Sequence, residues 1–173
     1  MKKSTRSLTR SAVIAAAYVV ISLLQNLIFP NSASMAVQCR VSEALCVLAL
    51  FSPAAIPGLS LGCLLFNLIS AATLPLDWFI GTAATVLATM GMYYFRKIRI
   101  GRLPLLSLVM PALANGLLVG FELTVYIQGS AFWFNAVCVA AGELIVLLTM
   151  GTALYFALRP LQHRIFEKTD NSI

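Results

Sequence analysis

Apolar residues fill this chain in long runs, and short segments rich in proline, glycine or charge separate them. A helix needs about 20 apolar residues to cross a bilayer, and only a helix or a closed barrel satisfies its own backbone groups in lipid. The runs predict about six helices, over residues 8–29, 42–51, 54–74, 77–95, 103–126 and 132–158. The second run is short for a full crossing, so we expect its outer end, or the loop before it, to fold into the protein.

The composition fits a membrane protein and excludes an ordinary soluble domain. Hydrophobic residues make up 60% of the 173 residues, charged residues make up 10%, and the mean hydropathy is +0.91. Soluble domains are about half apolar and about a quarter charged. We therefore expect an all-α integral membrane protein, a bundle of about six transmembrane helices. Residues 1–173 would form one transmembrane domain with a polar cytoplasmic tail over about 162–173.

The formal charge of +6 comes from basic residues that gather in three places. They precede the first run, separate the fourth run from the fifth, and follow the last. These residues are Lys2, Lys3, Arg6, Arg10, Arg96, Lys97, Arg99, Arg102, Arg159, Arg164 and Lys168. The distribution follows the positive-inside rule, so it predicts cytoplasmic N and C termini and does not indicate a nucleic-acid surface. The first run has the length of a span and lacks a small-x-small cleavage site, so we interpret it as a retained helix.

Four of the six carboxylates, Glu43, Asp77, Glu122 and Glu143, lie inside the apolar runs or at their ends. Arg40 is the one opposite charge on the same side of the membrane. A charge against hydrocarbon costs several kcal/mol unless it is paired or faces an aqueous cavity. The set is net acidic by about three charges, which predicts a cavity, open to the outside, for a cationic ligand rich in hydrogen-bond donors.

Amides and aromatic residues complete the candidate site. Gln38, Asn67 or Asn115 could donate to a ring carbonyl of the ligand, and Trp78 lies close enough to the outer ends of the helices to stack on a ring. The candidate substrate-binding residues are Gln38, Arg40, Glu43, Asn67, Asp77, Trp78, Asn115, Glu122 and Glu143. We expect the loop 31–38 to gate the cavity.

Several of these residues also have a purely structural interpretation. Arg40 and Glu43, at positions i and i+3, could pair with each other and stabilise the second helix, for which Ser42 is the predicted N-cap. Asp77 could be only the N-cap of the fourth helix.

Trp78 and Trp133 could belong to an interfacial aromatic belt, and Asn67 and Asn115 could bond one helix to another.

Three stretches resemble the signature of the queuosine-precursor transporter (QueT) family: residues 38–45 (QCRVSEAL), 52–59 (SPAAIPGL) and 62–68 (GCLLFNL). Residues 76–85 and 111–116 agree with it. The resemblance implies a substrate-binding (S) subunit of an energy-coupling-factor (ECF) importer in the bacterial cell membrane. Its substrate would be 7-aminomethyl-7-deazaguanine or a close relative. Its partners would be a transmembrane coupling subunit and two ATPase subunits.

Ala12 and Ala16 form a small-xxx-small pair on the first helix, a spacing that lets another helix approach closely. The resemblance implies that this pair docks the coupling subunit. On spacing alone, packing within the chain is the alternative.

The sequence lacks the usual signatures of an enzyme. It has no G-x-x-x-x-G-K-[ST] phosphate loop, so ATP hydrolysis is expected in separate subunits. Its single histidine, His163, lies in the basic tail, and its four cysteines show no C-x-x-C spacing, so we expect no metal and no cofactor. Two alternatives stay open: an S subunit for another vitamin or nucleobase, and a membrane scaffold or enzyme whose carboxylates only hold helices together.

Overall fold

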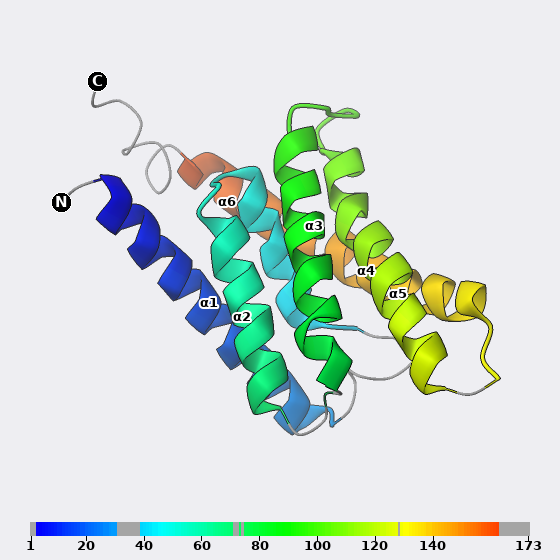
Figure 1. Cartoon of the computed structure of the whole chain (residues 1–173). Coiled ribbons are helices and arrows are strands. Elements are labelled where there is room, and N and C mark those ends of the chain that lie inside the picture. Colours follow the sequence, from blue (N-terminus) through cyan, green and yellow to red (C-terminus); the bar gives the residue numbers. More distant parts are fainter. Residues whose placement is uncertain (1–2, 31–38, 71–72, 74, 128, 163–173) are drawn as a thin grey trace.

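Helices cover nearly all of the chain that the structure, a computed structural model, describes: residues 3–30, 39–70, 73, 75–127 and 129–162. In chain order, the helices that build the bundle are α1 (Lys3–Ile28), η1 (Val41–Leu50), α2 (Ala55–Ile69), α3 (Ile80–Phe95), α4 (Leu105–Tyr126) and α5 (Phe132–Val146), which continues through the π turn η3 (Leu147–Gly151) into α6 (Thr152–Leu158) (Figure 1). Short 3-10 turns, η2 (Pro75–Trp78) and η4 (Arg159–Leu161), complete the set. The prediction of an all-α membrane protein is confirmed.

The helices differ in length, and in the described part of the chain three are long and apolar enough to cross a bilayer by themselves: Thr5–Ile28, Leu105–Tyr126 and Phe132–Leu161. The helices α2 and α3 have 15 and 16 residues, or about 22 to 24 Å at 1.5 Å per residue. The helix predicted over 54–74 ends at Ile69, because the backbone of Ser70 is extended (φ −77°, ψ 122°). The next helix begins at Ile80 and not at residue 77.

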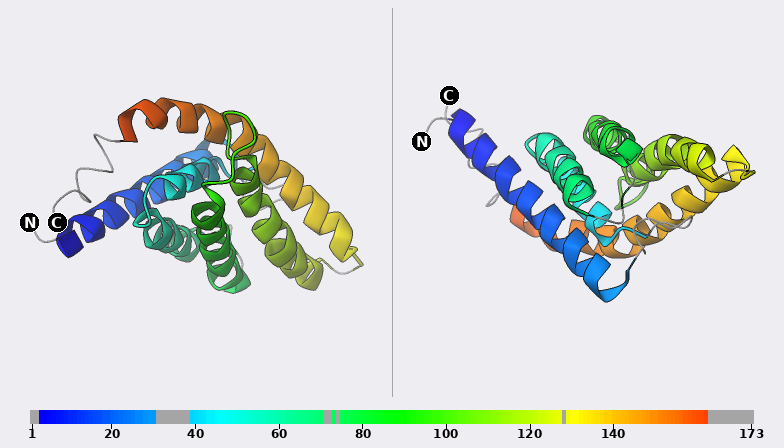
Figure 2. Two further views of the ribbon diagram at one scale, coloured as in Figure 1. Left: turned by 90° about the horizontal axis from the view of Figure 1, so that it is seen from above. Right: turned by 60° about the horizontal axis from the view of Figure 1, so that its bottom comes forward.

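The segment η1 is the centre of the bundle. It contacts α1, α2, α3, α4, α5, η3 and α6, and the right-hand view of Figure 2 shows a short cyan part of it near the middle of the bundle. Its ten residues form a 3-10 helix, which rises about 2.0 Å per residue and so spans about 20 Å. Neighbouring helices enclose this short, tightly wound helix.

The start of η1 differs from the prediction. Its N-cap is Arg40, which has an extended backbone and makes no side-chain cap bond, so Ser42 is not the cap. The buried Ser42 hydroxyl instead accepts a hydrogen bond from the Ser22 hydroxyl of α1 at 2.8 Å. Asp77 is not the cap of α3 either, because that helix follows Phe79 and has no side-chain cap bond.

Two pairs of helices approach closely at glycines. A Cβ atom added at Gly62 of α2 would lie 2.7 Å from the Cβ of Tyr18 in α1. One added at Gly120 of α4 would lie 2.7 Å from the Cα of Ala136 in α5. Such distances are shorter than van der Waals contact, so only glycine allows these backbones to meet.

The basic segments share one end of the bundle. The start of α1, the connection between α3 and α4, and the end of α6 all lie toward the top of Figure 1. The C-terminal ends of α2 and α4 lie toward the bottom. Asp77 and Glu122 belong to the bottom end, because Asp77 follows α2 and Glu122 is in the last turn but one of α4.

Candidate functional site

Most of the predicted ligand residues lie buried in the interior of the bundle. They come from the start of η1, from α2, η2, α4 and α5, and each is at most 6% exposed. These buried residues are Arg40, Glu43, Asn67, Asp77, Asn115, Glu122 and Glu143. Two candidates stand apart, since Trp78 is 37% exposed and Gln38, with the predicted gate 31–38, lies outside the described residues.

Arg40 connects the carboxylates of this group. It interacts electrostatically with Asp77 and Glu43, and also with Glu122 and Glu143. The carboxylates fall into two neighbouring pairs. Glu122 interacts electrostatically with Asp77, and Glu143 interacts with Glu43. One arginine therefore faces four buried carboxylates.

Glu43 is held by the protein itself. The Tyr18 hydroxyl donates to its Oε1 at 2.6 Å, and the Cys46 thiol donates to its Oε2 at 3.1 Å. Tyr18 is fully buried on α1. Both oxygens of Glu43 thus have donors, and the carboxylate ties α1 to η1.

Two more side chains of α1 hold the segment that leads into η1. The Gln25 side chain donates to the Cys39 carbonyl oxygen and accepts from the Val41 N–H at 2.7 Å. Ser22 donates to Ser42, as described above. Tyr18, Ser22 and Gln25 recur at i, i+4 and i+7, one face of a helix. We did not predict this polar stripe, although its spacing in the sequence is the signal that reveals it.

On the α4 and α5 side of the group, several buried polar atoms lack hydrogen-bond partners among the described residues. Within the described part of the chain, both carboxylate oxygens of Glu122, Oε2 of Glu143 and Nδ2 of Asn115 are buried without a hydrogen-bond partner. Asn115 and Glu143 interact with each other, but the Asn115 Nδ2 and the Glu143 Oε2 have no hydrogen-bond partner among the described residues. Leaving a buried polar atom unpaired costs about 1 to 3 kcal/mol, and more for a charge. These atoms point to a ligand more directly than the bonded oxygens of Glu43 do.

Asn67 has one side-chain atom that is hydrogen-bonded within the protein and one that lacks a partner among the described residues. Its Nδ2 donates to the Asp77 main-chain oxygen at 2.8 Å, which fixes η2 against α2. Its Oδ1 is buried without a partner among the described residues. Gly81 passes close by, because a Cβ there would lie 2.9 Å from the Asn67 Nδ2.

The tryptophans do not join the buried group. Trp133 is 71% exposed and meets Phe132 edge to face at 4.8 Å. Trp78 is also partly exposed, so an interfacial position describes both residues better than the interior does.

The two small faces of α1 point in different directions. Ser11 and Ala15 are buried, and the Ser11 hydroxyl donates to the Ala54 carbonyl oxygen at 2.8 Å. Ala12 and Ala16 are exposed. The pair predicted to dock a partner is therefore not covered by the rest of the described chain.

Among the described residues, no three His, Cys, Asp or Glu side chains form a group that could hold a metal ion. The four cysteines, all described, are free. The interior group is therefore one of acids, amides and a single arginine, a donor and acceptor set suited to an organic ligand.

Together these features define an all-α membrane protein whose helices enclose a group of ionisable side chains. The family model of the QueT transporter matches residues 8–160. The chain belongs to the QueT transporter family and is a membrane transporter, not an enzyme in its own right. Comparisons with curated proteins and with solved structures found no match.

Proposed function

We propose that this chain is the substrate-binding S subunit of an ECF-type importer, and that its substrate is the queuosine precursor 7-aminomethyl-7-deazaguanine. Membership of the QueT transporter family supports transport of a small molecule. The substrate assignment rests on one observation: several buried acids and amides have oxygen or nitrogen atoms that lack hydrogen-bond partners in the described chain.

The charge of the interior favours a cation. Four buried carboxylates face one arginine, so a fully ionised group would carry about three negative charges in a medium where each isolated charge costs several kcal/mol. A ligand that brings an ammonium group reduces this cost. The neighbouring oxygens of Asp77 and Glu122 suit that ammonium, since charge-assisted hydrogen bonds are the strong ones.

A guanine-like edge fits Glu143 and Asn115, two further side chains with polar atoms that lack hydrogen-bond partners among the described residues. Such an edge presents ring N–H and amine donors next to a carbonyl acceptor. Glu143 offers a carboxylate oxygen for the donors, and Asn115 offers an amide N–H for the carbonyl. Their neighbouring positions on α5 and α4 allow one ring to meet both.

The proposed partners are a transmembrane coupling subunit and two ATPase subunits. The exposed positions of Ala12 and Ala16 support a helix-docking role for this face of α1. The ATPase subunits would provide the ATP hydrolysis for which this chain has no phosphate loop.

We further propose that the single transmembrane domain lies in the bacterial plasma membrane with both termini in the cytoplasm. The basic segments at one end of the bundle, and Asp77 and Glu122 toward the other, support this orientation.

Calorimetric titration of the purified chain in detergent tests the substrate. We expect 7-aminomethyl-7-deazaguanine to bind with a Kd of about 1 μM or lower. The analogue 7-methyl-7-deazaguanine keeps the ring and lacks the ammonium, so we expect it to bind at least about tenfold more weakly. Guanine and riboflavin complete the series.

Matched variants test the site. Glu122→Gln and Glu143→Gln each remove a charge from the group and should weaken binding by about tenfold or more. Ser107→Ala is the control, because Ser107 is also buried on α4 without a partner among the described residues but lies near the other end of that helix. Tight binding of riboflavin alone would discard the substrate and keep the S-subunit role. No binding of any ligand would contradict the proposal.

A further inference from the structure

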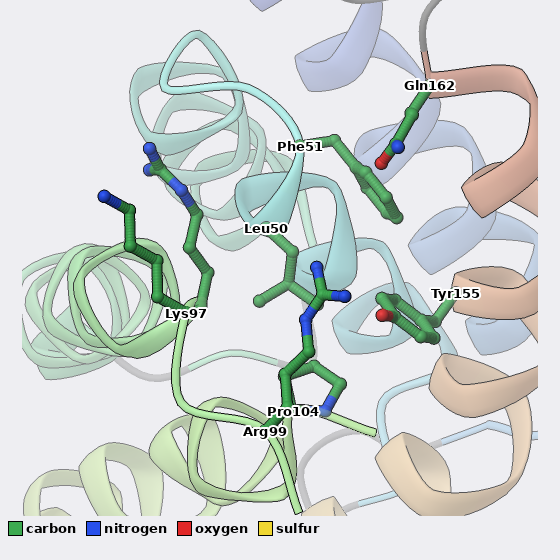
Figure 3. Close-up of a pocket in the computed structure, with 8 residues that line it drawn as sticks. Leu50, Phe51, Lys97, Arg99, Pro104, Tyr155 and Gln162 are labelled. Carbon is green, nitrogen blue, oxygen red and sulfur yellow. The ribbon is translucent and has the colours of Figure 1, made fainter. Parts of the chain in front are cut away.

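A cavity lies at the basic end of the bundle, apart from the buried carboxylates. It has a volume of about 420 Å³ and lies between the connection that follows α3, the end of η1 and the end of α6. Three of its lining residues are cationic: Arg96, Lys97 and Arg99. Tyr155 and Gln162 provide polar groups on the opposite wall (Figure 3).

The positive charge of this pocket is not compensated by the described chain. None of its described lining residues is a carboxylate, and all four described carboxylates belong to the other site. Arg96 is engaged, since its guanidinium lies 3.6 Å from the centre of the Tyr93 ring. Neither Lys97 nor Arg99 has a hydrogen-bond or ion-pair partner among the described residues. Figure 3 shows the Arg99 guanidinium pointing into the space between Leu50 and Tyr155.

Tyr155 gives the pocket a fixed wall. Its ring is buried and stacks on Phe51, with centroids 5.7 Å apart and an angle of 25° between the rings. The Tyr155 hydroxyl faces the same space as the Arg99 guanidinium (Figure 3). A rigid hydroxyl beside a guanidinium is a good donor set for a phosphate group, which has only acceptors.

Apolar residues beside the cations indicate a membrane source for that phosphate. Ile98 and Ile100 alternate with Lys97 and Arg99 along the chain. The two isoleucines are 49% and 64% exposed. A segment that exposes both isoleucine and basic side chains suits the boundary between headgroups and acyl chains. The positive-inside distribution predicts that this end meets the cytoplasmic leaflet, where anionic lipids gather.

We propose that this pocket binds the phosphate of an anionic phospholipid, with Arg99, Lys97 and Tyr155 as the donors. The bound headgroup would connect the α3–α4 segment to the end of α6 at the cytoplasmic surface. This inference does not depend on the identity of the transported substrate.

Native mass spectrometry of the full chain in detergent tests the proposal, with phosphatidylglycerol, phosphatidylcholine and soluble glycerol 1-phosphate as probes. We expect phosphatidylglycerol to be retained at least about tenfold more strongly than phosphatidylcholine, because the zwitterionic lipid has no net charge for the pocket. Glycerol 1-phosphate has the phosphate without acyl chains. If it displaces phosphatidylglycerol at equal concentration, the site belongs to a soluble phosphate compound and the lipid proposal is wrong.

Variants separate the pocket from general charge attraction. Arg99→Gln should weaken phosphatidylglycerol binding by about tenfold, and Tyr155→Phe, which keeps the stacked ring, by about threefold. Arg102→Gln is the control, because it removes the same charge from the same exposed connection outside the pocket. We expect it to change binding by less than about twofold. Equal losses for Arg99→Gln and Arg102→Gln, or no preference between the two lipids, would overturn the proposal.

Discussion

Replacing Tyr18 by phenylalanine removes a single oxygen atom from the junction between α1 and η1. The ring is fully buried and packs beside Gly62 of α2, so its volume and contacts stay. The lost group is the donor that lies 2.6 Å from Oε1 of Glu43. The Cys46 thiol would still donate to this carboxylate, and a thiol is a weak donor.

The size of the effect follows from the type of bond. A hydrogen bond to a charged group contributes about 1.5 to 3 kcal/mol, whereas a neutral bond contributes about 1 kcal/mol. We therefore expect Tyr18→Phe to lower the free energy of unfolding by about 2 kcal/mol. Tyr94→Phe is the control, because Tyr94 is 80% exposed and lies outside this junction; it should change stability by less than about 0.5 kcal/mol.

Reversible unfolding by sodium dodecyl sulfate in mixed micelles measures these differences. A double-mutant cycle that adds Glu43→Gln isolates the interaction between the two side chains, and we expect a coupling energy of about 1 kcal/mol or more. A coupling energy near zero, or equal effects of Tyr18→Phe and Tyr94→Phe, would refute the anchoring role of Glu43.

Three further changes test the packing and the α1 face. Gly62→Ala should destabilise the protein by about 1 to 3 kcal/mol in the same unfolding assay, because the new Cβ would overlap Tyr18; an unchanged midpoint would contradict the close approach of α1 and α2. Ala16→Leu should leave the ligand titration unchanged and abolish co-purification with the proposed coupling subunit, since the residue is exposed; retained co-purification would remove this face from the docking surface. Gln25→Leu should increase hydrogen exchange of the Val41 amide, because that N–H loses its acceptor; unchanged exchange would show that α1 does not hold this segment.

The helices could be predicted because each apolar run must form its own backbone hydrogen bonds in lipid. The residues at which the helices begin and end could be predicted less well. Hydropathy continues through Leu74, but α2 stops at Ile69 where Ser70 turns to an extended backbone. The order of the helices can thus be predicted from the lengths of the apolar runs. A helix end that depends on local backbone geometry cannot be predicted in this way.

The buried group could be predicted as a composition but not as a set of pairs. Acids within apolar runs are costly, so their presence indicated an interior site. Which acid meets which partner depends on contacts between distant parts of the chain, such as Tyr18 with Glu43 and Asp77 with Glu122. Ser42 shows the same limit, because a serine that looks like a helix cap bonds to another helix instead.

The two sides of the buried group differ in which polar atoms are already bonded. On the α1 side, Tyr18 and Cys46 occupy the oxygens of Glu43, and that side holds η1 in place. On the α4 and α5 side, Glu122 and Glu143 keep oxygens without partners among the described residues. A ligand that bonds to the second side would also change the field at Arg40, which interacts with carboxylates on both sides. Glu43 bonds to Tyr18 of α1, and another face of α1 exposes Ala16, so this one helix contacts the buried group and carries the proposed docking surface.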